Sequence, residues 1–150
     1  MNEDYYIKAV SALGLKYMDK KKDEVLVEFK TKNMRDKFSK CAKFLLYETG
    51  NKYDGGVGTK CVFAKGYIKI PKEYESSNEQ YNKNFPFTIK CVIEKVVENH
   101  HQGFSIDMIN KICPGLNFQP KPTRGGLYPI NKTQFNALSA EMSEEWKKLF

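Results

Sequence analysis

One stretch of the sequence, from Lys60 to Ile70, alternates side-chain types with the period of two that is typical of a β-strand. One side of this strand would carry Val62, Ala64, Gly66, Ile68 and Ile70, and the other would carry Phe63, Lys65, Tyr67 and Lys69. Aromatic rings give nucleic-acid bases a stacking surface, and interleaved ammonium groups neutralise phosphates. The second side is therefore a candidate single-strand-binding face. The alternative is that a helix covers its two rings and leaves the lysines at the rim.

Two other segments project cations that could contact phosphates. They are an amphipathic helix expected at 33–50 and a Pro- and Gly-rich loop at 119–126 that has no acidic residue. Binding residues are often found on such loops, although the charge here could equally serve only to keep the loop solvated. The candidate binding residues in these two segments are Arg35, Lys40, Lys43, Lys121 and Arg124.

The overall charge points to a polyanionic partner. The chain of 150 residues has a formal net charge of +7, and 23 of its 25 basic residues are lysine. A lysine is a flexible point charge, whereas arginine supplies the planar fork that reads guanine edges. We therefore expect phosphate contacts of low sequence specificity, to DNA or RNA. An AT-rich coding sequence would also enrich lysine, so mutational bias is a competing explanation for part of the charge.

Asp19, Glu28 and Lys30 place two carboxylates and a lysine near an expected hairpin. The arrangement resembles the metal-binding core of PD-(D/E)xK nucleases, in which the carboxylates would hold Mg²⁺ and the lysine would steady developing charge. The same Glu-x-Lys triplet arises readily in a lysine-rich chain and fits a solvated strand face. We predict no catalytic residues, no metal site and no cofactor.

The four cysteines are Cys41, Cys61, Cys91 and Cys113, and no two form a Cys-x-x-Cys pair. This spacing predicts free, buried thiols in a reducing compartment rather than a zinc site or a disulfide framework. No apolar run approaches the ~20 residues of a membrane span, and the first residues lack the basic and apolar regions of a secretory signal. We expect an intracellular protein, in the cytoplasm or nucleus, that does not associate with membranes.

The N-terminal half of the sequence indicates a mixture of helices and strands. We predict a helix at 2–13, a hairpin of strands at 15–18 and 25–29, the helix at 33–50, capped by Asn33 and ended by Gly50, and the strand at 60–70. Residues 73–84 are polar and are expected to form a loop or linker.

The C-terminal half has mainly helical spacing. Ile89, Val92, Ile93, Val96 and Val97 fit one face of a helix at 86–99, and a strand is the weaker alternative. Ser105 is expected to cap a helix that ends at 112, and a final helix follows a capping box of Asn131 and Gln134. The first two of these helices could pack as a pair or form a helix-turn-helix with a wing strand at 127–130.

These patterns predict an α+β fold in which a small mixed sheet, made of a hairpin and a longer strand, packs with amphipathic helices. The expected organisation is a sheet-containing subdomain at 1–75, a linker at 76–84 and a mainly helical subdomain at 85–150. The predicted function is non-enzymatic nucleic-acid binding through lysine and aromatic contacts. The alternative is an interaction protein of viral, phage or mobile-element type that binds and modulates a larger protein. The sequence does not indicate an oligomeric state.

Overall fold

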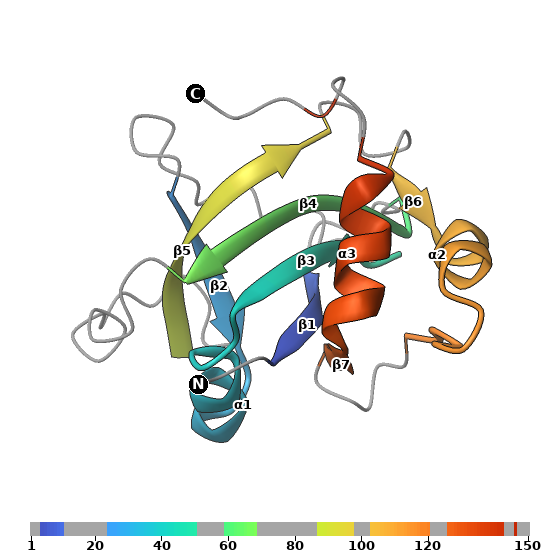
Figure 1. The fold of residues 1–150 in the computed structure, drawn as a ribbon. Helices are drawn as coiled ribbons and strands as arrows, with labels where there is room; N and C mark the ends of the chain where they lie inside the picture. Colours follow the sequence, from blue (N-terminus) through green and yellow to red (C-terminus); the bar gives the residue numbers. More distant parts are fainter. Residues whose placement is uncertain are drawn as a thin grey trace.

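The computed structural model describes residues 4–10, 24–50, 59–68, 87–97, 103–120, 126–142 and 146. Within them, seven strands form one curled sheet and three short helices pack on it (Figure 1). The strands are β1 (Tyr5–Val10), β2 (Glu24–Phe29), β3 (Lys43–Glu48), β4 (Cys61–Ile68), β5 (Phe87–Val96), β6 (Phe104–Ser105) and β7 (Leu127–Ile130). The helices are α1 (Lys32–Phe38), α2 (Ile106–Ile112) and α3 (Lys132–Ala140). The described chain is mostly strand, so the predicted α+β fold with a helical C-terminal half is wrong.

The order of the strands in the sheet is β2-β5-β4-β3-β1-β7, and β6 pairs with β4 beyond the end of β5. β1 runs parallel to β3, and the other neighbours are antiparallel. Strands of the C-terminal half therefore pair with strands of the N-terminal half. The expected linker at 76–84 lies outside the described residues, and the division into subdomains stays a prediction.

Two segments that we predicted as helices are strands. Residues 5–10 of the helix predicted at 2–13 form β1, and most of the helix predicted at 86–99 forms β5. In β5, Ile89, Cys91 and Ile93 are buried in alternation, and the register then shifts by one residue before the buried Val96. Because of this shift, the buried residues Ile89, Ile93 and Val96 are four and three residues apart, which is the spacing expected in a helix. Without a helix at 86–99, neither the packed helical pair nor the helix-turn-helix forms.

The helix predicted at 33–50 is also partly wrong. Thr31 rather than Asn33 is its N-cap, α1 ends at Phe38, and β3 begins at Lys43. The residues from Phe44 to Tyr47 are all buried, which is the pattern of a strand that packs on both faces. The apolar residues of α1 and of β3 happen to follow one another at helical spacing, so the sequence suggested a single helix.

Other local predictions are confirmed. β2 and β4 form where strands were expected, and Ser105 caps α2 by accepting a hydrogen bond from the Met108 amide at 3.2 Å. Asn131 and Gln134 form the predicted capping box of α3. The strand predicted at 15–18 and the loop predicted at 73–84 lie outside the described residues.

The four cysteines are free and buried, as predicted. Burial raises the pKa of each thiol, and raises that of Cys41 to about 12, so the reactive thiolate form is disfavoured at neutral pH. None of the described helices has the length and apolar character needed to cross a bilayer.

The concave face of the sheet is filled by aromatic rings. Phe38 of α1 packs between Phe29 of β2 and Phe44 of β3, with ring centroids 5.1 and 4.9 Å away. The ammonium group of Lys8, on β1, lies 4.8 Å from the centre of the Phe29 ring. Because β1 and β2 are far apart in the strand order, this contact shows how strongly the sheet curls.

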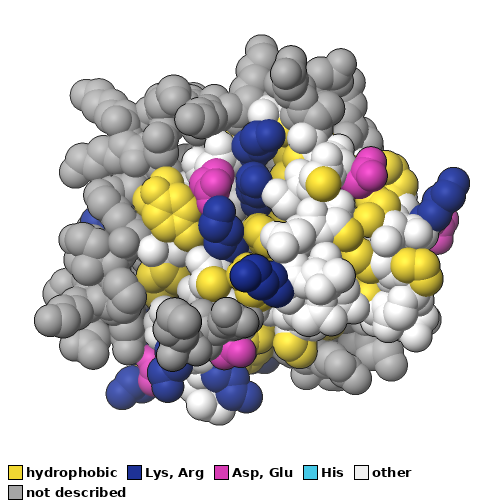
Figure 2. Space-filling model, in the orientation of Figure 1, with side chains coloured by type: hydrophobic (Ala, Val, Ile, Leu, Met, Phe, Trp, Pro, Cys, Tyr) yellow, Lys and Arg dark blue, Asp and Glu magenta, His cyan; other side chains and the backbone are white. Residues whose placement is uncertain are grey.

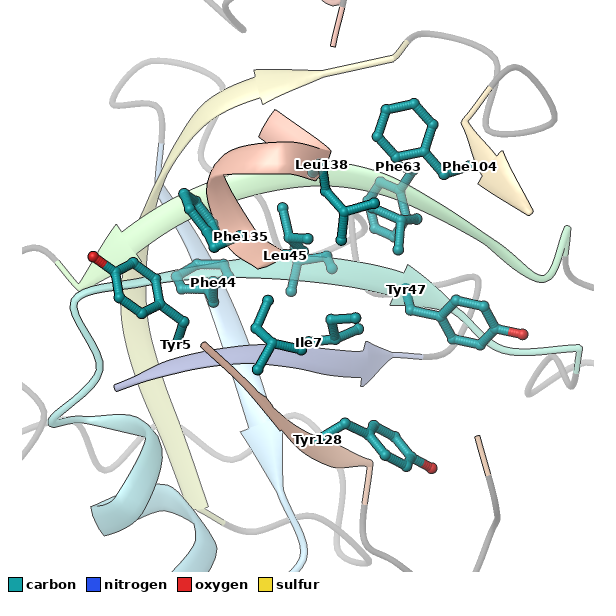
Figure 3. Close-up of a cluster of buried hydrophobic side chains, with 14 of the residues drawn as sticks. Tyr5, Ile7, Phe44, Leu45, Tyr47, Phe63, Phe104, Tyr128, Phe135 and Leu138 are labelled. Atoms are coloured by element: carbon teal, nitrogen blue, oxygen red, sulfur yellow. The ribbon is translucent and has the colours of Figure 1, made fainter. Parts of the chain in front are cut away.

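The opposite face of the sheet is covered by α3, and we call it the α3 face. Phe135 of α3 stacks against Tyr5 of β1 with centroids 5.0 Å apart, and Leu138 is fully buried. Figure 3 shows both α3 side chains pointing into the cluster that contains Ile7 and Leu45. β3 is therefore enclosed on both faces, between α3 and the concave core.

A lysine is buried in the concave core. Lys8 is 4% exposed, and burial lowers its pKa to about 8, although the nearby carboxylate of Glu28 acts in the opposite direction. Burial also raises the pKa of Glu28, and Lys8 partly offsets that rise. The two groups thus stabilise each other's charged forms where water does not reach them freely.

A β-bulge lies where β4 meets β5. Lys65 pairs with Lys95 and Gly66 pairs with Ile93, so Glu94 is an extra residue on β5. Gly66 is packed so closely here that a Cβ would collide with the carbonyl oxygen of Val92 and would lie 3.0 Å from the Phe44 ring. Glycine at this position allows the bulge and the aromatic core to form side by side.

Gly66→Ala is therefore expected to destabilise the fold by about 2 kcal/mol or more, because the added methyl group must displace backbone. Gly115→Ala is the matched control, since a Cβ there has no atom within 4 Å. Urea unfolding followed by circular dichroism measures both. Equal stability of the two variants would contradict the close packing at Gly66.

Lys8 is expected to contribute a rise in stability of about 1 kcal/mol from about pH 7.5 to about pH 9, seen as a difference from Lys8→Met, because folded Lys8 releases its proton before unfolded Lys8 does. Below the folded pKa of about 8, the cost of burying the ammonium group is fully present. Lys8→Met should lack this rise, whereas the cysteines and tyrosines titrate in both proteins. Urea unfolding at several pH values and fixed salt checks this, and parallel pH profiles of the two proteins would contradict it.

Candidate nucleic-acid interface

Lys65 is the centre of a group of charged side chains on the α3 face. It lies on β4 opposite Lys95 of β5 and opposite Leu45 of β3. Lys43 is two residues from Leu45 along β3, so strand alternation places it on this same face. We call Lys43, Lys65 and Lys95 the lysine cluster.

One carboxylate lies within the lysine cluster. Oε1 of Glu94 is 3.1 Å from Nζ of Lys43, so the ion pair reaches from β5 to β3 across β4. Glu94 is paired with Lys43 and also acts on Lys65, so one carboxylate among three ammonium groups leaves the cluster with a net positive charge. Figure 2 shows a row of basic side chains over β3, β4 and β5, beside α3, with an acidic group next to it.

The environment of Lys65 disfavours its protonated form. Partial burial is the largest cause of its lowered pKa, and repulsion from Lys43 and Lys95 adds to it, while Glu94 opposes the change. Like charges that are held together by a rigid sheet raise the free energy of the unliganded protein. An anion bound among them would relieve that repulsion.

The side chain of Lys65 is also held in position by α3. Its Nζ donates a hydrogen bond of 2.7 Å to Oγ of Ser139, in the last turn of the helix. The serine hydroxyl accepts this bond, so its own hydrogen can be donated elsewhere. Lys65 and Ser139 together offer N–H and O–H donors at the edge of the lysine cluster.

The predicted binding face of β4 is only partly open. Phe63 is 1% exposed and belongs to the core beneath α3, whereas Tyr67 is 37% exposed. Lys65 is partly exposed and lies between them along the strand. Phe63 is therefore not available on an open face, as had been expected, and Tyr67 is not covered by a helix, as the alternative required.

Among the remaining predicted binding residues that the structure describes, Arg35 and Lys40 lie on or just after α1, apart from this group. Arg35 lies on α1, with its guanidinium 5.4 Å from the Phe87 ring, and Lys40 is exposed just after α1. Lys43 does join the group, but from a strand rather than from the predicted helix. Lys69, Lys121 and Arg124 lie outside the described residues.

Sequence reasoning missed Lys95, Glu94 and Ser139. Lys95 and Glu94 belonged to the segment predicted as a helix, and only the bulge places both opposite Lys65. Ser139 is 74 residues from Lys65 in the sequence, and no spacing rule joins residues so far apart. Had residues 86–99 been predicted as a strand, the adjacent charged residues Glu94 and Lys95 would have been a signal of a charged site on that strand.

The nuclease-like set gains no support from the described residues. The carboxylate of Glu28 faces Lys8, and Lys30 is exposed just beyond the end of β2. Asp19 lies outside the described residues. Among the residues that were described, no group of three or more potential metal ligands occurs. The absence of catalysis stays a prediction.

No protein-family model matches the chain, and no curated protein matches its sequence. One solved structure that it resembles is that of a serine-to-alanine mutant of ZmASCH from Zymomonas mobilis. The match has a TM-score of 0.52 and 12% sequence identity, and covers 95% of this chain and 99% of that chain. At this identity the likeness shows the fold alone. The curled sheet with its short helices is therefore similar to the fold of ZmASCH.

Proposed function

We propose that this protein binds nucleic acid with low sequence specificity, through the lysine cluster and Tyr67. The observation that carries the proposal is the convergence of Lys43, Lys65 and Lys95 on one face, with Glu94 as the acidic side chain paired among them. Phosphate groups would neutralise this charge and release counterions. The overall charge of +7 supports the same class of partner.

Tyr67 supports single strands as the ligand. It lies two residues from Lys65 on the same strand and remains exposed beyond the part of β4 that packs under α3. An unpaired base could stack on its ring while the adjacent phosphates contact the lysines, whereas the bases of a duplex are stacked on one another. The cluster contains no arginine, so the guanine-reading fork is missing from it and contacts to phosphates dominate.

Lys95→Gln should weaken binding of a fluorescein-labelled oligothymidylate of about 12 nucleotides by about three- to tenfold and reduce its salt slope by about 0.7. Lys111→Gln is the control, because it removes the same charge from an exposed position on α2. Fluorescence anisotropy across a salt series measures both. Equal effects of the two variants, or absent wild-type binding near 50 mM salt, would overturn the proposal.

Tyr67→Ala should lower the affinity for the same oligonucleotide by about fivefold to a hundredfold, the range for a lost base-stacking contact. Its melting temperature should change little, since the ring is partly exposed. Met108→Ala removes the other exposed large hydrophobic side chain among the described residues and should leave binding unchanged. A Tyr67→Ala protein that is strongly destabilised yet binds normally would assign the ring to the core instead.

A further inference from the structure

The position of Glu94 follows from the β-bulge rather than from regular strand geometry. In an unbroken strand, Glu94 and Lys95 would point to opposite faces of the sheet. Here both residues lie opposite the single residue Lys65, and a bulge of this kind turns its two side chains toward the same side. The fold has thus placed a carboxylate on the face where the lysines gather.

The contact that Glu94 makes there is an ion pair without a hydrogen bond. Its Oε1 is itself buried and lies 3.1 Å from Nζ of Lys43 without hydrogen-bond geometry, whereas the side chains of Glu94 and Lys43 as a whole are 27% and 43% exposed. Partly exposed ion pairs of this kind contribute little to stability. Glu94 can therefore move away from Lys43 at little cost to the fold.

We propose that Glu94 is a built-in competitor for the phosphate groups of the ligand, and that it occupies Lys43 until a polyphosphate strand displaces it. This inference rests on the proposed function, because it concerns the same lysine cluster. In the free protein, Glu94 lessens the repulsion among the three lysines. In the complex, a phosphate takes its place on Lys43, and neighbouring phosphates reach Lys65 and Lys95.

Such a competitor would favour particular anions. Because Glu94 is tethered beside Lys43, its effective concentration is in the millimolar range or above, so an isolated carboxylate gains nothing by replacing it. A strand of phosphates contacts several lysines at once and can also accept a hydrogen bond from Ser139. The device thus makes the site selective for closely spaced phosphates over carboxylate polyanions.

The test compares Glu94→Gln with Asp107→Asn, an exposed carboxylate on α2 whose loss changes the net charge equally. Glu94→Gln should bind the labelled oligothymidylate about three- to tenfold more tightly and steepen the salt slope by about 0.7, because Lys43 becomes free to pair with a phosphate. Asp107→Asn should change the affinity by less than about twofold. Competition with poly-glutamate should become more effective against Glu94→Gln than against the wild type.

A double-mutant cycle with Lys43→Gln separates displacement from a general charge effect. If Glu94 acts by occupying Lys43, Glu94→Gln should give no gain in the Lys43→Gln background. A full gain in that background, or equal affinities of Glu94→Gln and Asp107→Asn, would overturn the inference while leaving the proposed function intact. Absent binding by the wild type and by Glu94→Gln alike would overturn the proposed function itself.

Discussion

The central strands of the sheet must be buried on both faces, and the rest of the structure depends on this constraint. Phe44 faces the aromatic core with Phe29 and Phe38, while the adjacent Leu45 belongs to the face that α3 covers. One sheet can satisfy both requirements only if it curls around the first cluster and receives a helix on the other side. The same curl brings Lys8 of β1 to the ring of Phe29 on β2.

The candidate interface lies where this double coverage ends. α3 stops at Ala140, and Ser139, in its last turn, holds Lys65 by a hydrogen bond. Beyond Lys65 along β4, none of the described helices covers this face of the strand, and Tyr67 is exposed. The place where α3 crosses β4 thus decides how much of the predicted binding face is core and how much is exposed.

The bulge at Glu94 connects packing to electrostatics. Gly66 permits close approach of the Val92 backbone on the concave side, and the extra residue on β5 sends Glu94 and Lys95 to the other side. A change at Gly66 would therefore disturb the core and the lysine cluster together. Burial is the largest cause of the lowered pKa values of both Lys8 and Lys65, although the two lysines lie on opposite faces of the sheet. Lys8 is enclosed in the core, whereas Lys65 is only partly buried on the α3 face.

The sequence alone determined those features that depend on neighbouring residues. The cap at Ser105, the capping box at Asn131 and the alternating strand β4 all follow from local hydrogen bonds or local side-chain direction. Burial of the cysteines followed from their apolar surroundings. The basic and aromatic character of the candidate site was also visible, because Lys65 and Tyr67 are close in sequence.

Only the tertiary structure decided which apolar patterns were strands and which charges came together. The bulge in β5 shifted its alternation by one residue and gave it helical spacing, and two-sided burial removed the alternation from β3. Lys43, Glu94 and Ser139 meet Lys65 through strand pairing and helix packing between residues distant in the sequence. Local patterns carry no information on such pairing, since a register is fixed by the whole set of strands that must share one core.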